Sequence, residues 1–290
     1  MTTSPTTWPS QGARSTYALR LSDDEQARYR MMADRARVEE GELWAAAGLT
    51  DGARVADVGC GPGAMLVALA EVVGPTGHVV GIDGDPEAVV TARSALAAAR
   101  TTDPRIATGE VHEGRADSTG LPPASVDIAV LRHVLAHNGG AEQRIVDHLA
   151  ALVRPGGHVY LLDVDLTTAS STGAGPDVEE LVNRYRRWHQ SRGNDPRVGR
   201  RLPDLARTAG LTVTRHRCWT LRMGFARGMR GPAWAARDEL MRAGMATAAD
   251  LARWDAAFTA FDGLATGRPA FTLDVVAVVG RRPAPPEESS

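Results

Sequence analysis

The chain contains no lysine, so all 33 of its basic residues are arginine. This absence excludes mechanisms that need a lysine Schiff base or the lysine of a phosphate-binding P-loop. No apolar run approaches the roughly 18 residues that a membrane-spanning helix needs. The first 20 residues lack the basic and apolar regions of a secretory signal. We therefore expect a cytoplasmic protein that makes no membrane contact.

Cysteine is also scarce, with only Cys60 and Cys218 in 290 residues. Two cysteines cannot by themselves form a disulfide framework or a structural zinc site. The length lies near the upper limit for a single hydrophobic core, and 43% hydrophobic content is enough to build one. We expect one domain with an insertion. The bias toward Ala, Gly and Arg suggests a GC-rich bacterial genome.

Short apolar runs alternate with helical patterns through the first part of the chain. The expected strands are 53–59, 78–83, 110–117, 126–133 and 158–165, and the expected helices between them are 64–73, 85–99 and 141–153. Asp85 and Pro86 are a predicted N-cap and first helical residue. This alternation predicts an α/β fold with a doubly wound, mostly parallel sheet.

The pattern changes after residue 165. We expect a small-residue loop at 167–176, helices at 178–190 and 202–211, a strand at 212–222, a helical stretch at roughly 233–262 and a last strand at 271–282. The predicted organisation is an N-terminal helical arm (1–48), a seven-stranded domain (49–282) with helical lid insertions at about 166–200 and 224–265, and a disordered tail (283–290). A capping box at 22–25 predicts where the arm's helix begins.

The segment VADVGCGPG (55–63) joins the first strand to its helix. Gly59, Gly61 and Gly63 allow a sharp turn and a close approach of the backbone to a ligand. Asp57 lies inside the strand, and Asp83 ends the next strand, 22 residues after Gly61. A carboxylate there can bind both hydroxyls of a ribose. The glycine spacing differs from that of dinucleotide enzymes, which disfavours a dehydrogenase.

These residues, together with GIDGDPEAV (81–89), ADSTGLP (116–122), VDIAVLRHVLAH (126–137) and VRPGGHVYLLDVD (153–165), resemble the motifs of class I S-adenosylmethionine-dependent methyltransferases. The resemblance covers about 50–165 and implies a Rossmann-like methyltransferase fold. It implies binding of S-adenosylmethionine, with S-adenosylhomocysteine as product and no metal. The implied cofactor-binding residues are Asp57, Gly59, Gly61 and Gly63 near the methionine part, Asp83 and Gly84 at the ribose, Asp117 and the Ser118 amide at the adenine, and the Arg132 carbonyl at the amino group.

The acceptor side offers three candidate residues. His133 follows the fourth strand, at the edge of the sheet where ligands bind, and is the first candidate for a base. His137 lies four residues later, on the same face if 133–137 is helical. Tyr17, in the N-terminal segment, is a candidate for closing the pocket. Each has a purely structural alternative, as do Asp163 and Asp165, which we interpret as polar strand-end residues, not metal ligands.

Residues 182–230 hold 13 Arg against Asp195 and Asp204 only. Three explanations stay open for this segment: ion pairs within the protein, docking of an acidic or planar small molecule, and RNA binding. The net charge of −2 and the lack of an RNA-binding module disfavour RNA. We expect methyl transfer to a small-molecule acceptor, such as a phenol, an amine or an electron-rich aromatic carbon, in bacterial specialised metabolism. An RNA methyltransferase and a non-catalytic cofactor-binding relative are the alternatives, and a homo-oligomer is compatible with the sequence.

Overall fold

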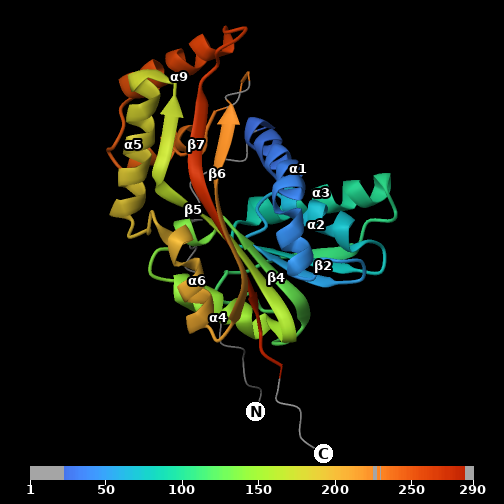
Figure 1. Ribbon diagram of the computed structural model, residues 1–290. Coiled ribbons are helices and arrows are strands. Elements are labelled where there is room, and N and C mark those ends of the chain that lie inside the picture. The colour runs from blue at the N-terminus through green and yellow to red at the C-terminus, as the bar shows by residue number, and fades with distance from the viewer. Residues whose placement is uncertain (1–22, 225–226, 229, 285–290) are drawn as a thin grey trace, which may run out of the picture.

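The computed structural model describes residues 23–224, 227–228 and 230–284, and it contains a seven-stranded mixed sheet (Figure 1). The strands are β1 (Arg54–Val58), β2 (His78–Asp83), β3 (Thr108–Glu113), β4 (Val126–Arg132), β5 (Val153–Thr172), β6 (Thr212–Gly224) and β7 (Ala270–Arg281). Their order is β3-β2-β1-β4-β5-β7-β6. Strands β1 to β5 are parallel, and β7 runs antiparallel to both β5 and β6. The predicted doubly wound, mostly parallel sheet is confirmed.

Helices cover both faces of this sheet. They are α1 (Asp23–Ala46), α2 (Ala64–Val73), α3 (Pro86–Thr102), α4 (Glu142–Leu152), α5 (Gly175–Ser191), α6 (Val198–Thr208), α7 (Pro232–Ala235), α8 (Arg237–Arg242) and α9 (Ala248–Asp262), with a short 3₁₀ helix η1 (Leu135–His137) after β4. Figure 1 shows α1, α2 and α3 on one side of the sheet and α4 and α6 on the other. Strands β1 and β4 are buried almost throughout, as expected of strands covered on both faces.

Helices α5, α7, α8 and α9, here called the outer helices, pack beside the far halves of β5 and β7 (Figure 1). They have a hydrophobic core of their own, separate from the core around the sheet and built on Leu181, Trp188, Trp254 and Phe258. The molecule therefore has two apolar cores, and β5 and β7 run alongside both.

Two sequence predictions are wrong in this part of the chain. Residues 167–172 were expected in a loop, but they continue β5, where Ser170, Ser171 and Thr172 pair with the start of β7. Threonine and serine tolerate extended backbone, and the partner strand supplies the hydrogen bonds that a local pattern cannot reveal. The expected helix over 233–262 is split into three. The split before α9 follows from Gly244 at φ +67° and from a capping box that Thr247 makes with Asp250.

The structure tests the predicted start of α3 but not the predictions for the two chain ends. Asp85 caps α3 by accepting a hydrogen bond from the Glu87 amide (3.0 Å), and Pro86 is its first residue, as predicted. Tyr17, the capping box that begins at Ser22, and most of the predicted tail lie outside the described residues. None of the described helices combines the length and the apolarity that crossing a membrane requires.

Candidate cofactor and acceptor site

The loop between β1 and α2 turns sharply at its glycines. Gly59, Gly61 and Gly63 have φ of +77°, +53° and +87°. A side chain at Gly59 would overlap Val134, and a Cβ on Gly63 would lie 2.7 Å from the Cα of Ala92 in α3. Gly59 and Gly63 therefore require glycine because of both backbone conformation and space, whereas Gly61 requires it because of backbone conformation alone. The result is a tight strand–loop–helix turn beside the segment that follows β4.

Asp57 lies in β1 immediately before this loop, and it is 2% exposed. Its Oδ2 has no hydrogen-bond partner among the described residues. Burial raises the pKa of Asp57 to about 7, while nearby Arg132 lowers it and Asp83 raises it further. A buried carboxylate oxygen without a donor is costly unless a ligand satisfies it. Asp57 therefore marks a place for a donor or cation next to the glycine loop.

Asp83 ends β2 and is tied to the same loop. Its Oδ2 accepts a hydrogen bond from the Gly61 amide (2.8 Å), and its Oδ1 accepts one from the Asp85 amide (2.9 Å). Each carboxylate oxygen keeps a second lone pair, so both stay able to accept from hydroxyls. Burial raises the pKa of Asp83, although the backbone donors, Gly84 among them, oppose this. The carboxylate thus holds the glycine loop in place.

Asp117 lies in the loop after β3, with its carboxylate largely shielded from solvent. It accepts hydrogen bonds from Arg115 Nε (3.0 Å) and Nη2 (3.2 Å), and Arg144 lies within 3.5 Å. The side-chain hydrogen bond of Arg115 lowers the pKa of Asp117. The Ser118 amide donates to the Arg115 carbonyl (3.0 Å), so this N–H is used inside the turn. Asp117 lies after the end of β3, and its predicted contact with the adenine stays a prediction.

Arg132 ends β4 and takes part in a buried cluster that the sequence analysis missed. Its Nη2 and Nε donate to Oε1 (2.5 Å) and Oε2 (3.1 Å) of Glu40 in α1. The Tyr160 hydroxyl (2.8 Å) and the Trp44 indole (3.3 Å) donate to the same Glu40 carboxylate. The cluster attaches α1 to the centre of the sheet. Two features of the sequence could have indicated this cluster. Glu40 lies close to the apolar pair Leu43–Trp44, and Tyr160 lies within an apolar strand.

His133 follows β4 directly and adopts φ +57°, a conformation uncommon for a residue with a side chain. The sequence predicted that His133 and His137 share a face if 133–137 is helical. This condition is not met, because only Leu135–His137 is helical, as η1. Burial lowers the pKa of His133 well below its usual value, and Arg132, Arg28 and His137 add to this. None of the described residues makes a side-chain hydrogen bond to the His133 ring. A neutral imidazole in this position can accept a proton.

His137 lies at the junction between η1 and the outer helices. Its ring meets that of His189 in α5 edge-on at 5.0 Å, and His189 in turn contacts Tyr185 at 4.5 Å. Burial lowers the pKa of His137 to about 3 and that of His189 to about 4. Asn194 forms hydrogen bonds to both sides of the junction. Its Nδ2 lies 2.8 Å from His189 Nδ1, and its Oδ1 accepts a hydrogen bond from the Gly139 amide (3.0 Å). His137 therefore packs in this junction, and its candidate role at the acceptor stays a prediction.

The aspartates after Leu162 also have structural partners. Asp163 accepts hydrogen bonds from the amides of Ala136 (3.1 Å) and Val164 (2.9 Å), and burial raises its pKa to about 7. Asp165 pairs with Arg200 and accepts from the Thr167 amide (2.9 Å). Both carboxylates are buried and have partners within the protein, but they lie in the middle of β5 and not at a strand end, because the strand continues to Thr172.

A largely apolar cavity of about 80 Å³ lies between the outer helices and the far halves of β5, β6 and β7. Its wall includes Tyr185 of α5, Trp234 of α7, Phe258 of α9 and Phe271 of β7. Arg28 of α1 also lines it, and the same arginine lies close enough to His133 and His137 to lower the pKa of both. Arg28 is thus shared by the cavity wall and the surroundings of His133, although His133 itself does not line the cavity.

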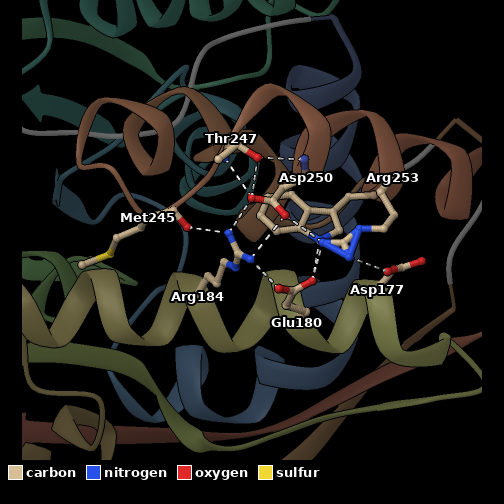
Figure 2. A network of polar contacts seen from close by, with 8 residues as sticks. Asp177, Glu180, Arg184, Met245, Thr247, Asp250 and Arg253 are labelled. Atoms are coloured by element: carbon tan, nitrogen blue, oxygen red, sulfur yellow. Dashed lines mark hydrogen bonds and ion pairs between the residues drawn. The ribbon is translucent and has the colours of Figure 1, made fainter.

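Ion pairs inside the protein occupy several of the arginines of residues 182–230. Figure 2 shows Arg184 between Glu180 of its own helix and Asp250 of α9, with Arg184 Nη1 2.7 Å from the Asp250 carboxylate. Arg184 also donates to the Met245 carbonyl (2.9 Å), and Arg253 joins Asp250 (2.8 Å) to Glu180 (2.7 Å). Further along, Arg201 pairs with Asp195 (2.8 Å) and Arg230 with Asp262 (3.0 Å). Ion pairs within the protein therefore account for Arg184, Arg201 and Arg230 of the basic segment.

With this geometry in place, comparison with known proteins decides the family. The sequence profile of the methyltransferase domain family matches residues 49–196, which contain the glycine loop, Asp83, Asp117 and His133. The chain belongs to this family. The resemblance to class I S-adenosylmethionine-dependent methyltransferases is thereby confirmed.

Individual relatives share only part of their length with this methyltransferase-family chain. It is 31% identical to the arsenite methyltransferase of Halobacterium salinarum over 137 residues, 47% of this chain and 33% of that protein. It is 34% identical to the ubiquinone biosynthesis O-methyltransferase of Xylella fastidiosa over 132 residues, 45% of this chain and 50% of that protein. The matched region thus spans half or less of these two curated relatives. A putative methyltransferase from Bacillus halodurans shares the fold, with a TM-score of 0.54 and 16% identity over 85% of this chain and all of that one.

Proposed function

We propose that the protein transfers the methyl group of S-adenosylmethionine to a small organic acceptor. This proposal rests on the arrangement of Asp57, the glycine loop and Asp83 at the carboxyl ends of β1 and β2. The unpartnered Oδ2 of buried Asp57 is where the positively charged amino group of the cofactor would bind. Asp83 would bind the ribose hydroxyls and Asp117 the adenine amino group. S-adenosylmethionine supplies an electrophilic methyl group when bound.

The acceptor would enter the cavity beneath the outer helices, which would act as its lid. The apolar walls exclude water and hold the acceptor in one orientation, and such positioning is a large part of what a methyl transfer needs. His133 would be the base that takes the proton from an acceptor hydroxyl or amine; its lowered pKa keeps it neutral but also makes it a weak base, which suits an acidic acceptor such as a phenol. The acceptor is a phenol, an amine or an electron-rich aromatic carbon of specialised metabolism. The two curated relatives act on acceptors of different kinds, arsenite and a ubiquinone precursor, so their names favour neither.

Calorimetry with S-adenosylhomocysteine tests the cofactor half of this proposal. We expect Asp83→Ala to weaken binding at least about tenfold, because each hydrogen bond to a charged group contributes about 1.5–3 kcal/mol. Asp103→Ala is the matched control, since Asp103 lies at the other end of α3 and pairs only with Arg105. Undiminished binding in Asp83→Ala, or no binding by the unaltered protein, would contradict the proposal.

A further inference from the structure

The buried pair of Glu40 and Arg132 lies on the same face of the sheet as Asp57. Val130 of β4 pairs with Asp57 of β1 on one side and with Tyr160 of β5 on the other, so these side chains share a face. Arg132 is two residues further along β4 and points the same way. Asp57 and Arg132 are therefore diagonal neighbours on adjacent strands, where buried charges interact strongly. The pKa of Asp57 reflects this, because Arg132 lowers it.

Glu40, Arg132 and ionised Asp57 together carry one negative charge in excess. Two hydrogen bonds join Arg132 to the Glu40 carboxylate, from Nη2 (2.5 Å) and from Nε (3.1 Å), so Glu40 neutralises the arginine. The Tyr160 hydroxyl and the Trp44 indole also donate to Glu40 and hold its carboxylate in place. No described residue donates to Asp57 Oδ2. One buried arginine thus faces two carboxylates, and a cation bound at Asp57 would balance them.

We propose that Glu40 is a positioning residue of the cofactor site, which acts by neutralising Arg132 and thereby lets Asp57 bind the ligand's ammonium group. The inference rests on the proposed function, because it takes Asp57 to be the site of that group. The positive charge of Arg132 favours ionised Asp57, and Glu40 prevents the same charge from repelling the cationic end of the ligand. Helix α1 is in this way coupled to the cofactor site through one arginine.

The charged and titratable groups around Asp57 give the sign of the expected pH effect. Asp83 at the end of β2 and Arg132 of β4 act on Asp57 directly, and Asp57 in turn acts on the Cys60 thiol of the glycine loop. Glu40 of α1 acts through Arg132. Removal of the Glu40 charge leaves the effect of Arg132 unopposed, so the pKa of Asp57 should fall. Removal of both charges should raise it, because the arginine is the group that lowers it.

Two ligands that differ in their amino-acid part separate this role from a general loss of structure. Calorimetry at pH 8 would compare S-adenosylhomocysteine with 5′-methylthioadenosine, which has the same adenosine part but no amino group. In Glu40→Gln we expect about tenfold weaker binding of S-adenosylhomocysteine and unchanged binding of 5′-methylthioadenosine, because only the former brings a cation to Asp57. Glu39→Gln is the matched control, since Glu39 makes a partly exposed pair with Arg35, and both of its affinities should equal those of the unaltered protein.

The pH profile provides a readout that a purely structural role of Glu40 would not change. Its midpoint is the pH at which the affinity for S-adenosylhomocysteine reaches half of its plateau. We expect the midpoint to fall in Glu40→Gln and to rise in the double variant Glu40→Gln/Arg132→Met, which keeps the backbone carbonyl of residue 132. Replacing a buried ion pair as a whole is often neutral for stability, so the double variant decides the question if Glu40→Gln does not fold in a urea-unfolding check.

Three results would overturn the inference: an equal loss of both ligands in Glu40→Gln, undiminished binding of S-adenosylhomocysteine by that variant, or an unchanged midpoint in the double variant. If the unaltered protein binds S-adenosylhomocysteine in those cases, the proposed methyltransferase function stands. Its failure to bind would remove both.

Discussion

At the scale of single residues, the site depends on carboxylates whose surroundings differ. Asp83 receives two backbone amides, whereas buried Asp57 leaves one oxygen without a partner in the described structure. We therefore expect the two carboxylates to respond differently to a ligand. Asp83 is already positioned by the loop that it holds, while Asp57 becomes fully satisfied only when a cationic donor arrives.

The pKa of Asp57, about 7, predicts a pH dependence of cofactor binding. Below pH 7 the carboxyl is mostly protonated, and above it the carboxylate is available to the ligand's amino group. The affinity for S-adenosylhomocysteine should therefore rise about tenfold between pH 6 and pH 8 and then level off. Calorimetry across this range measures it.

Asp57→Asn should flatten this dependence because it removes the titrating group. Asp51→Asn should retain it, since Asp51 is an exposed residue before the opposite end of β1. A flat profile in the unaltered protein would contradict the assignment of Asp57 to the amino group.

The residues predicted from the sequence and those missed differ in a physical way. Glycines at fixed spacing and acids at strand ends are local signals, so Asp57, Gly59 and Asp83 could be found without a structure. Glu40 and Tyr160 were missed because they are 120 positions apart and become neighbours only when α1 folds onto the sheet.

At the scale of elements, α1 is held by charge as well as by apolar packing. The Arg132–Glu40 pair is almost fully buried, with side chains 10% and 4% exposed. Removing one partner of such a pair leaves the other charge uncompensated. The Glu40 carboxylate therefore adds to the apolar packing that holds α1 against the sheet.

Glu40→Gln should lower the free energy of unfolding by about 3 kcal/mol or more, because it leaves the Arg132 charge buried beneath α1 without a carboxylate partner. Urea denaturation followed by circular dichroism measures the change. Glu39→Gln is the neighbouring control, since Glu39 makes only a partly exposed pair with Arg35, and its cost should stay below about 1 kcal/mol. Equal effects of the two substitutions would show that the buried pair does not hold the helix.

Strand β5 shows where element prediction stops working. Its central part, the expected strand 158–165, is apolar and was predicted, but its extension to Thr172 consists of small and hydroxylated residues. Nothing within that segment distinguishes a strand from a loop, and the pairing with β7 decides it. The same holds for the helices after residue 232, whose interruptions follow from a turn at Gly244 and a new cap at Thr247.

At the scale of the whole molecule, the two cores meet at a group of neutral histidines. His189 is 1% exposed, and its pKa of about 4 lies below the ordinary value of 6.5. The unfolded chain therefore binds a proton between these values while the folded protein does not. Folding stability from this residue is complete above pH 6.5 and is lost as the pH falls toward 4.

The variant His189→Gln isolates this effect. Between pH 6.5 and pH 5 the unaltered protein should lose about 1.6 kcal/mol of unfolding free energy relative to the variant, because the unfolded histidine becomes protonated over this range and the folded one does not. Urea unfolding at the two pH values measures the difference. His216→Gln changes an exposed histidine of β6 and should show no such divergence. Parallel pH profiles for unaltered protein and His189→Gln would refute the linkage.

The 20-residue strand β5 has a consequence for protein engineering. Its hydrogen bonds to β7 extend from His158 beside the glycine-loop core to Thr172 beside the outer helices. Grafting the outer helices of a relative onto this chain at residues 166 and 265 would cut through a shared ladder of backbone hydrogen bonds. Exchange of substrate specificity between family members is therefore better attempted by changing side chains of the cavity wall than by recombining whole segments.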